Sequence, residues 1–133
     1  MSKYMEKAKK LRAIEVPHHN CAQSVLMSFT DALGIDDETA FKTGACFGGG
    51  MKCGSTCGVV TGGLMVLGLL GIDAPATTQK YVSEFKARHE GMLDCADLLK
   101  ANAKKGLERK PHCDALVYEA VEEIEKIMAA NGK

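Results

Sequence analysis

One uninterrupted segment, from Cys53 to Ile72, constrains the fold more than any other part of the sequence. It reads CGSTCGVVTGGLMVLGLLGI and contains no charged residue, so it needs shielding from water in a protein core or a bilayer. Its six glycines, with Ser and Thr, lower its hydrophobicity, and no aromatic belt flanks it. We therefore predict a buried central helix, beginning at Ser55 or Thr56 and ending near Leu70, and no membrane span.

The rest of the chain repeats apolar residues at helical spacing, with helix-capping and helix-ending residues between the repeats. Besides the central helix, helices are predicted over residues 4–14, 20–34, 36–44, 77–91 and from Pro111 to about 128, with a short turn from Asp94. The glycines at 48–50 must form a loop. No segment alternates apolar and polar residues as a strand does. We predict an all-α fold, a compact bundle of five or six helices with a glycine-rich loop before the buried helix, in one domain over residues 1–133.

Charge excludes one large class of function. The chain has 17 basic and 17 acidic residues, and the basic ones are dispersed, which argues against nucleic acid as a partner. The N-terminal MSKYMEKAKKLRAIEV is too charged for a signal peptide, so we expect a cytoplasmic protein. In that reducing compartment, six cysteines indicate metal ligation or redox chemistry rather than a disulfide framework.

Four of the cysteines fall where helices are expected to begin, and these are Cys21, Cys57, Cys95 and Cys113. Unpaired N–H groups and a positive partial charge in a first turn favour the thiolate, which is the form that binds metals and attacks disulfides. If all four converge, cations must lie between them, as in a metal site or an iron–sulfur cluster. If they lie apart, they are individual redox thiols. Their spacings match no compact ligand motif and leave both alternatives open.

The remaining cysteines and the histidines have less defined roles. Cys46 and Cys53 flank the glycine loop and could be auxiliary ligands, a reversible redox pair or plain buried thiols. His18 and His19 precede Cys21, and His112 precedes Cys113, so each is a candidate ligand as well as an ordinary loop residue.

Three glycines, Gly54, Gly58 and Gly62, recur every four residues and share a face of the predicted central helix. Something must approach that face closely. One candidate is the backbone of another helix. The other is a cofactor lying over bare backbone, whose N–H groups would hydrogen-bond cluster sulfides.

The segments NCAQSVL, FGGGM, TCGVVTGGLMVLG and DCADLL and the late HC occur in this order, and with them the chain resembles the C-GCAxxG-C-C family of redox-active proteins. The resemblance spans about residues 20–128 and implies that the family's four cysteines are Cys21, Cys57, Cys95 and Cys113. A related domain of split-Soret cytochromes carries a 2Fe-2S cluster, so the resemblance implies such a cluster here. The chain differs from the pattern at Val59, where the family has alanine, and in adding Cys46 and Cys53.

Together these observations predict a protein that binds an iron–sulfur cluster, of the 2Fe-2S type, for electron transfer or redox sensing. In this interpretation the four first-turn cysteines are the ligands, and Gly54 and Gly58 give the cofactor space and backbone donors. One alternative is a metal-free thiol-disulfide or thiol-transfer protein that uses Cys53 and Cys57, and another is a structural zinc protein. The expected partner is an unidentified redox protein, and a homodimer is compatible with so small a chain.

Overall fold

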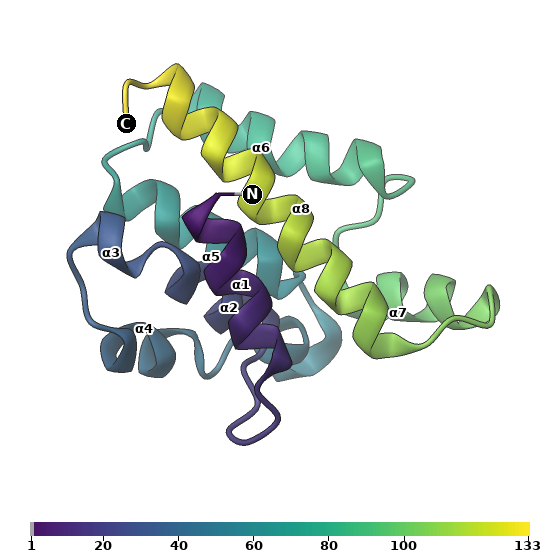
Figure 1. Ribbon diagram of the computed structural model, residues 1–133. Helices are drawn as coiled ribbons and strands as arrows, with labels where there is room; N and C mark the ends of the chain where they lie inside the picture. The colour runs from purple at the N-terminus through teal and green to yellow at the C-terminus, as the bar shows by residue number, and fades with distance from the viewer. Residues whose placement is uncertain (1) are drawn as a thin grey trace.

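Figure 1 shows the computed structural model, which describes residues 2–133. These residues form helices and no strand, which confirms the all-α prediction. The elements in chain order are α1 (Lys3–Ala13), α2 (Cys21–Ser28), α3 (Thr30–Leu33), α4 (Asp37–Gly44), the short η1 (Gly50–Gly54), α5 (Gly58–Leu69), α6 (Pro75–Arg88), α7 (Cys95–Lys104) and α8 (Arg109–Ala130). The described residues thus contain more helices than the predicted five or six, because one predicted helix is divided, the turn after Asp94 is a full helix and the glycine loop includes the short η1.

Side-chain caps set two of the helix starts that the sequence predicts, at Asn20 and Asp36, whereas α6 begins at Pro75 rather than at Thr77 or Thr78. The Asn20 side chain accepts a hydrogen bond from the backbone N–H of Gln23, whose side chain in turn accepts from the Asn20 N–H. Asp36 caps α4 in the same manner through the N–H of Thr39. The predicted helix over 20–34 is interrupted at Phe29, a buried residue whose ring stacks on that of Tyr4.

Helix α5 is the buried central helix, although it begins later than predicted, at Gly58. Its side chains Val59, Val60, Val66 and Leu67 are almost completely buried within one hydrophobic core. Helices α2, α6 and α8 all pack against it. Within residues 2–133, no helix is both long enough and apolar enough to cross a membrane.

Bare glycine backbone lets α2 and α5 approach closely. A Cβ atom on Gly58 would lie 2.9 Å from the Ala22 nitrogen, and one on Gly62 would lie 2.8 Å from the Ala22 carbonyl oxygen. The face of these two glycines is therefore covered by the backbone of another helix. Gly54 does not share this face, because it lies outside α5 in η1 and lies against Ala96.

The segment before α5 is irregular, as the loop prediction requires. Residues 49–52 all adopt positive φ, including the non-glycine residues Met51 and Lys52 at 58° and 59°. A side chain at Gly50 is excluded, because its Cβ would lie 2.3 Å from the Ser55 carbonyl oxygen and 2.8 Å from the Cys95 Cβ. This left-handed turn folds the chain back and brings Ser55 next to the start of α7.

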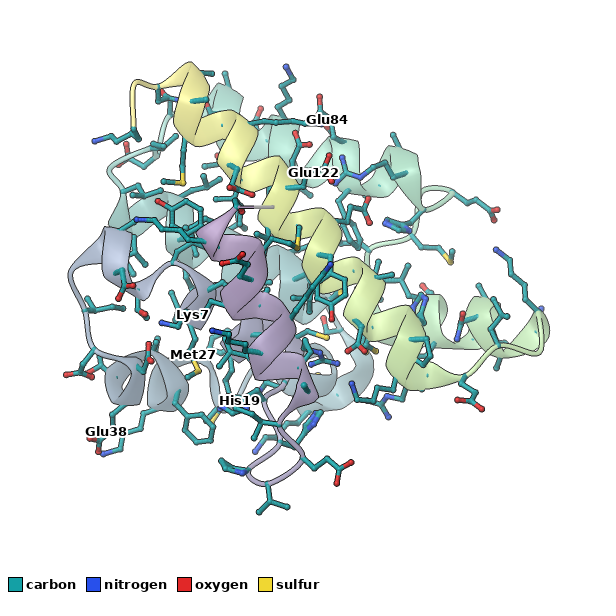
Figure 2. All side chains as sticks on the ribbon, viewed as in Figure 1. Lys7, His19, Met27, Glu38, Glu84 and Glu122 are labelled. Atoms are coloured by element: carbon teal, nitrogen blue, oxygen red, sulfur yellow. The ribbon has the colours of Figure 1, made fainter. Side chains whose placement is uncertain are left out.

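The last two helices, α7 and α8, carry two of the cysteines. Helix α8 crosses the front of the bundle beside α1, while α7 projects to the side and packs on α8 and η1 (Figure 1). Helix α8 begins at Arg109, two residues before the predicted start at Pro111. Cys113 therefore lies one turn inside the helix rather than in its first turn. On the opposite side, Lys7, labelled in Figure 2, joins α1 to Thr30 and Asp37 through hydrogen bonds of 2.6 and 2.8 Å.

Candidate functional site

Four cysteines from four helices line a single small cavity of about 30 Å³. Cys21 is the first residue of α2, Cys57 is the N-cap of α5, Cys95 is the first residue of α7 and Cys113 lies in α8. All four are free thiols, and Cys57 is the most deeply buried. Residues far apart in the chain thus meet at one place.

A short antiparallel pairing places Cys57 beside Cys95. Thr56 and Asp94 form an isolated β-bridge, with hydrogen bonds from the Cys57 N–H to the Leu93 carbonyl (2.9 Å) and from the Cys95 N–H to the Ser55 carbonyl (2.6 Å). The segment entering α5 and the segment entering α7 are therefore held side by side. Each cysteine lies directly after its bridge residue, so in this antiparallel pairing the two lie on either side of the bridge, Cys57 opposite Leu93 and Cys95 opposite Ser55.

The other two cysteines are placed by packing and by an ion pair. The missing side chain of Gly58 leaves room for Cys21, whose Cβ would lie 3.1 Å from a Gly58 Cβ. Arg12 holds α8 against α2, because its Nε donates to the Asp114 carboxylate (2.7 Å) and its Nη1 to the His19 carbonyl (2.7 Å). Asp114 follows Cys113 directly, so this contact brings Cys113 to Cys21.

Burial and proximity push the pKa values of these thiols apart. A hydrogen bond to Cys113, together with burial, raises the pKa of Cys21. The same hydrogen bond lowers the pKa of Cys113, against the effect of burial and with help from Arg109. Burial raises the pKa of Cys57 to about 12 and also raises that of Cys95. In the metal-free protein, the first proton lost from the cavity therefore comes from the Cys21 and Cys113 pair, with the negative charge on Cys113.

This order predicts which thiol reacts first. At pH 7, iodoacetamide is expected to alkylate Cys113 at least about ten-fold faster than Cys57 in metal-free protein, because the thiolate is the nucleophile. Peptide mapping by mass spectrometry after timed quenching measures both rates in one sample. Arg109→Gln removes a group that lowers the pKa of Cys113, so it is expected to move the pH dependence of Cys113 labelling upward. Equal rates at Cys113 and Cys57 would contradict the order of ionisation.

The chain matches a family model described as "Putative redox-active protein (C_GCAxxG_C_C)" over residues 19–127. The chain belongs to the C_GCAxxG_C_C family. All four cavity cysteines lie within the matched region, and the resemblance seen in the sequence is confirmed. No curated protein and no solved structure matches the chain.

Within this C_GCAxxG_C_C chain, the three candidate histidines occupy different environments. His112 lines the cysteine cavity, and its Nε2 is buried with no hydrogen-bond partner in residues 2–133. His19 is also buried, with its ring edge against Phe41, and its Nδ1 has no partner within the same residues. His18 is exposed and lines a separate surface pocket beside Cys21. Of the three, His112 is thus the one next to all four thiols.

The two additional cysteines of this family member lie outside the cavity. Cys46 follows α4 and Cys53 lies in η1, and both are exposed. The Cys53 sulfur lies 3.5 Å from the Gly50 carbonyl oxygen. Gly58 contributes to the cavity wall, whereas Gly54 does not. The structure therefore separates Cys53, on the surface, from Cys57, which is 4% exposed.

Two arginines at the site were not anticipated from the sequence. Arg12 lies four residues after Ala8, on the buried face of α1. A charged residue at such a position was the signal in the sequence for an internal ion pair. Arg109 lies four residues before Cys113, which puts the two on one face of α8. The sequence prediction began this helix at Pro111, so it left Arg109 outside the helix and did not place it on the same face as Cys113.

Proposed function

We propose that the protein binds an iron–sulfur cluster, of the 2Fe-2S type, through Cys21, Cys57, Cys95 and Cys113, and uses it for electron transfer or redox sensing. The observation that carries this proposal is the meeting of four free thiols from four helices around one cavity. The family description, which is a redox-active one, supports it.

The donor set fits such a group in number and in kind, since four thiolates are the usual ligands of a 2Fe-2S cluster. Within residues 2–133, no three His, Cys, Asp or Glu side chains are already spaced to hold a single metal ion. Ligation therefore requires the cysteine side chains to turn toward one another. Burial, which raises the pKa of Cys57 and Cys95, would then be opposed by the positive charge of the metal.

The neighbouring residues have roles that suit this chemistry. A bound cluster supplies one-electron oxidation and reduction. Arg109 lies beside Cys113 and offsets negative charge on the thiolates. Gly58 and Gly49 leave the cavity wall without side chains, and Leu98 and Leu116 limit access of water from the side of α7 and α8. The buried Nε2 of His112 is free to hydrogen-bond a sulfur atom.

A second candidate is thiol–disulfide chemistry at Cys113 and Cys21. Their proximity raises the pKa of Cys21 and lowers that of Cys113, which favours one thiolate beside one thiol, the arrangement of an attacking and a resolving cysteine. Cys57 suits this role poorly, because burial raises its pKa to about 12. Metal-free redox chemistry would therefore use Cys21 and Cys113 in place of the Cys53 and Cys57 pair.

The test is an absorption spectrum with iron and acid-labile sulfide assays on protein purified without oxygen. We expect visible bands with equal amounts of iron and sulfide, lost in Cys21→Ser and in Cys113→Ser. Cys46→Ser and Cys53→Ser are the matched controls, because both thiols are exposed and outside the cavity, and they are expected to retain the cluster.

The other outcomes separate the alternatives. A protein without iron and sulfide, even after anaerobic reconstitution, would overturn the cluster proposal. Stoichiometric zinc would then support a structural zinc site, and fast alkylation of Cys113 without metal would support thiol chemistry. Sedimentation velocity on the same samples tests for a homodimer, and the proposed redox partner would be sought only after a cluster is found.

A further inference from the structure

A second pocket opens to the surface beside the cysteine cavity. It has a volume of about 410 Å³ and shares Cys21, Gly49, Arg109 and Cys113 with the cavity. Sites for small molecules typically have volumes of about 300–1,000 Å³. A molecule bound in this pocket would therefore lie directly against two of the four cysteines.

The walls of the pocket are basic. Arg12, His18, Arg109 and Lys110 line it, and in the described part of the chain its lining includes no carboxylate. Asp114 lies behind this wall and pairs with both Arg12 and Lys110, at 2.7 and 3.0 Å. Three permanent cations against one carboxylate leave the pocket positive, although the whole chain has no net charge.

Two of these charges are fixed in place before any ligand arrives. Arg12 is 5% exposed and held by Asp114 and the His19 carbonyl. The Lys110 ammonium donates to the Arg12 carbonyl at 2.9 Å as well as to Asp114. Arg109 is exposed, so its planar guanidinium can pair with a carboxylate or oxyanion in two parallel hydrogen bonds. Fixed donors reduce the entropy lost when a ligand binds.

We propose that this basic pocket binds a small molecule bearing a carboxylate or oxyanion group and holds it against Cys21 and Cys113. The pocket is concave and of small-molecule size, whereas a stable protein partner needs a wide interface, commonly about 800 Å² on each side. The proposal rests on the side chains around the pocket, and it applies whether the cysteines hold a cluster, zinc or no metal.

The test compares two alkylating reagents at the same thiol. Iodoacetate is an anion and iodoacetamide is neutral, and both attack the same thiolate, so the ratio of their rates cancels the thiol pKa and reports charge selection. The protein is first freed of metal by anaerobic chelation, and its helical circular dichroism must be retained. We then expect the ratio at Cys113 to exceed that at exposed Cys46 by about five-fold at low salt. Inorganic phosphate and malonate, each at constant ionic strength, are expected to slow the reaction of iodoacetate with Cys113 but not with Cys46. Stronger inhibition by phosphate would indicate an oxyanion ligand, and stronger inhibition by malonate would indicate a carboxylate ligand.

A pair of double variants separates the pocket from the general field of the protein. Arg109→Gln with Lys110→Gln is expected to bring the ratio at Cys113 down to that at Cys46. Lys80→Gln with Lys126→Gln makes the same change in net charge in the groove between α6 and α8, where Glu84 is labelled in Figure 2, and is expected to leave the ratio unchanged. Equal ratios at Cys113 and Cys46 in the unmodified protein, or equal effects of the two double variants, would overturn the proposal.

Phosphate binding can also be measured on the protein as isolated, with any metal it contains. Broadening of the ³¹P signal of inorganic phosphate is expected with the unmodified protein and is expected to be lost in the Arg109 and Lys110 double variant. Absence of broadening in the unmodified protein would overturn the anion site. Because iron and sulfide contents are assayed separately, this result is independent of whether the cluster proposal succeeds.

Discussion

Replacing Arg12 with methionine is expected to lower the free energy of unfolding by about 3 kcal/mol. Methionine keeps much of the buried length of the side chain but removes the donors to Asp114 and to the His19 carbonyl. Both acceptors lie at the junction of α1, α2 and α8, where the Arg12 side chain is 4% exposed. Removing the arginine leaves the His19 carbonyl without its donor and leaves Asp114 paired only with the exposed Lys110, which is why the expected loss is large.

Lys110→Met is the matched control, because Lys110 pairs with the same carboxylate from an exposed position. Its loss is expected to be within about 1 kcal/mol, as for exposed ion pairs in general. Urea unfolding followed by circular dichroism measures both variants. Equal losses for Arg12→Met and Lys110→Met would show that burial of the pair has no special effect.

The ion pair also predicts a dependence on pH. Burial would raise the pKa of Asp114, but hydrogen bonds from Arg12 and Lys110 outweigh it and lower that pKa. A lowered pKa in the folded state stabilises the protein above the unfolded pKa of about 4, and this contribution is lost as the pH falls through the folded value. The difference in stability between the unmodified protein and Asp114→Asn is therefore expected to shrink steadily below pH 4. Urea unfolding at several pH values between 2 and 6 measures it.

Local signals in the sequence were sufficient for the helices that depend on local interactions. Asn20 and Asp36 begin their helices through hydrogen bonds to residues three positions along, and Gly34 ends α3 in the left-handed conformation. The apolar residues of α5 determine its burial whatever surrounds them. Hydrogen bonds between residues three positions apart can be predicted from the local sequence alone.

The starts of α5 and α8 could not be predicted in the same way. Ser55 and Thr56 are good capping residues, but they lie in the bridge to Asp94 and Cys95, so α5 begins after them. Pro111 is the third residue of α8 rather than the first. Proline is tolerated there because the N–H groups of the first turn have no partner within the helix. The start of α5 is thus set by a contact with a distant segment, and the start of α8 precedes a proline that the first turn accepts. The local sequence pattern shows neither.

The same distinction applies to the candidate site. Helix starts indicated which cysteines to consider, and the family resemblance supported the same four. Their convergence depends on the pairing of Thr56 with Asp94 and on the ion pair of Arg12 with Asp114, which join distant parts of the chain. No spacing in the sequence encodes either contact. The basic pocket beside Cys113 depends on the meeting of α1 and α8 at the Arg12–Asp114 pair, and the zero net charge of the chain gave no sign of it.

Placing alanine at Gly62 is expected to lower the free energy of unfolding by about 1–3 kcal/mol, although alanine is the better helix former by about 1 kcal/mol. The new Cβ would lie 2.8 Å from the Ala22 carbonyl oxygen and 3.0 Å from the Ala22 Cα. These are backbone atoms, which cannot rotate away as the end of a flexible side chain can. Helices α2 and α5 would have to separate, and α2 begins at Cys21, so the cysteine cavity would be widened as well.

Gly68→Ala in the same helix is the matched control, because Gly68 is exposed and nothing lies within 4 Å of the position of its Cβ. There only the helix propensity acts, so this variant is expected to gain about 0.5–1 kcal/mol. Urea unfolding of the two single variants should therefore give changes of opposite sign. If both variants were stabilised, the close approach of α2 to α5 would be absent in solution. Under the proposed function, iron content measured on the same samples shows whether the cavity depends on that approach: at equal folded fraction, Gly62→Ala is expected to bind less iron than the unmodified protein and Gly68→Ala the same amount.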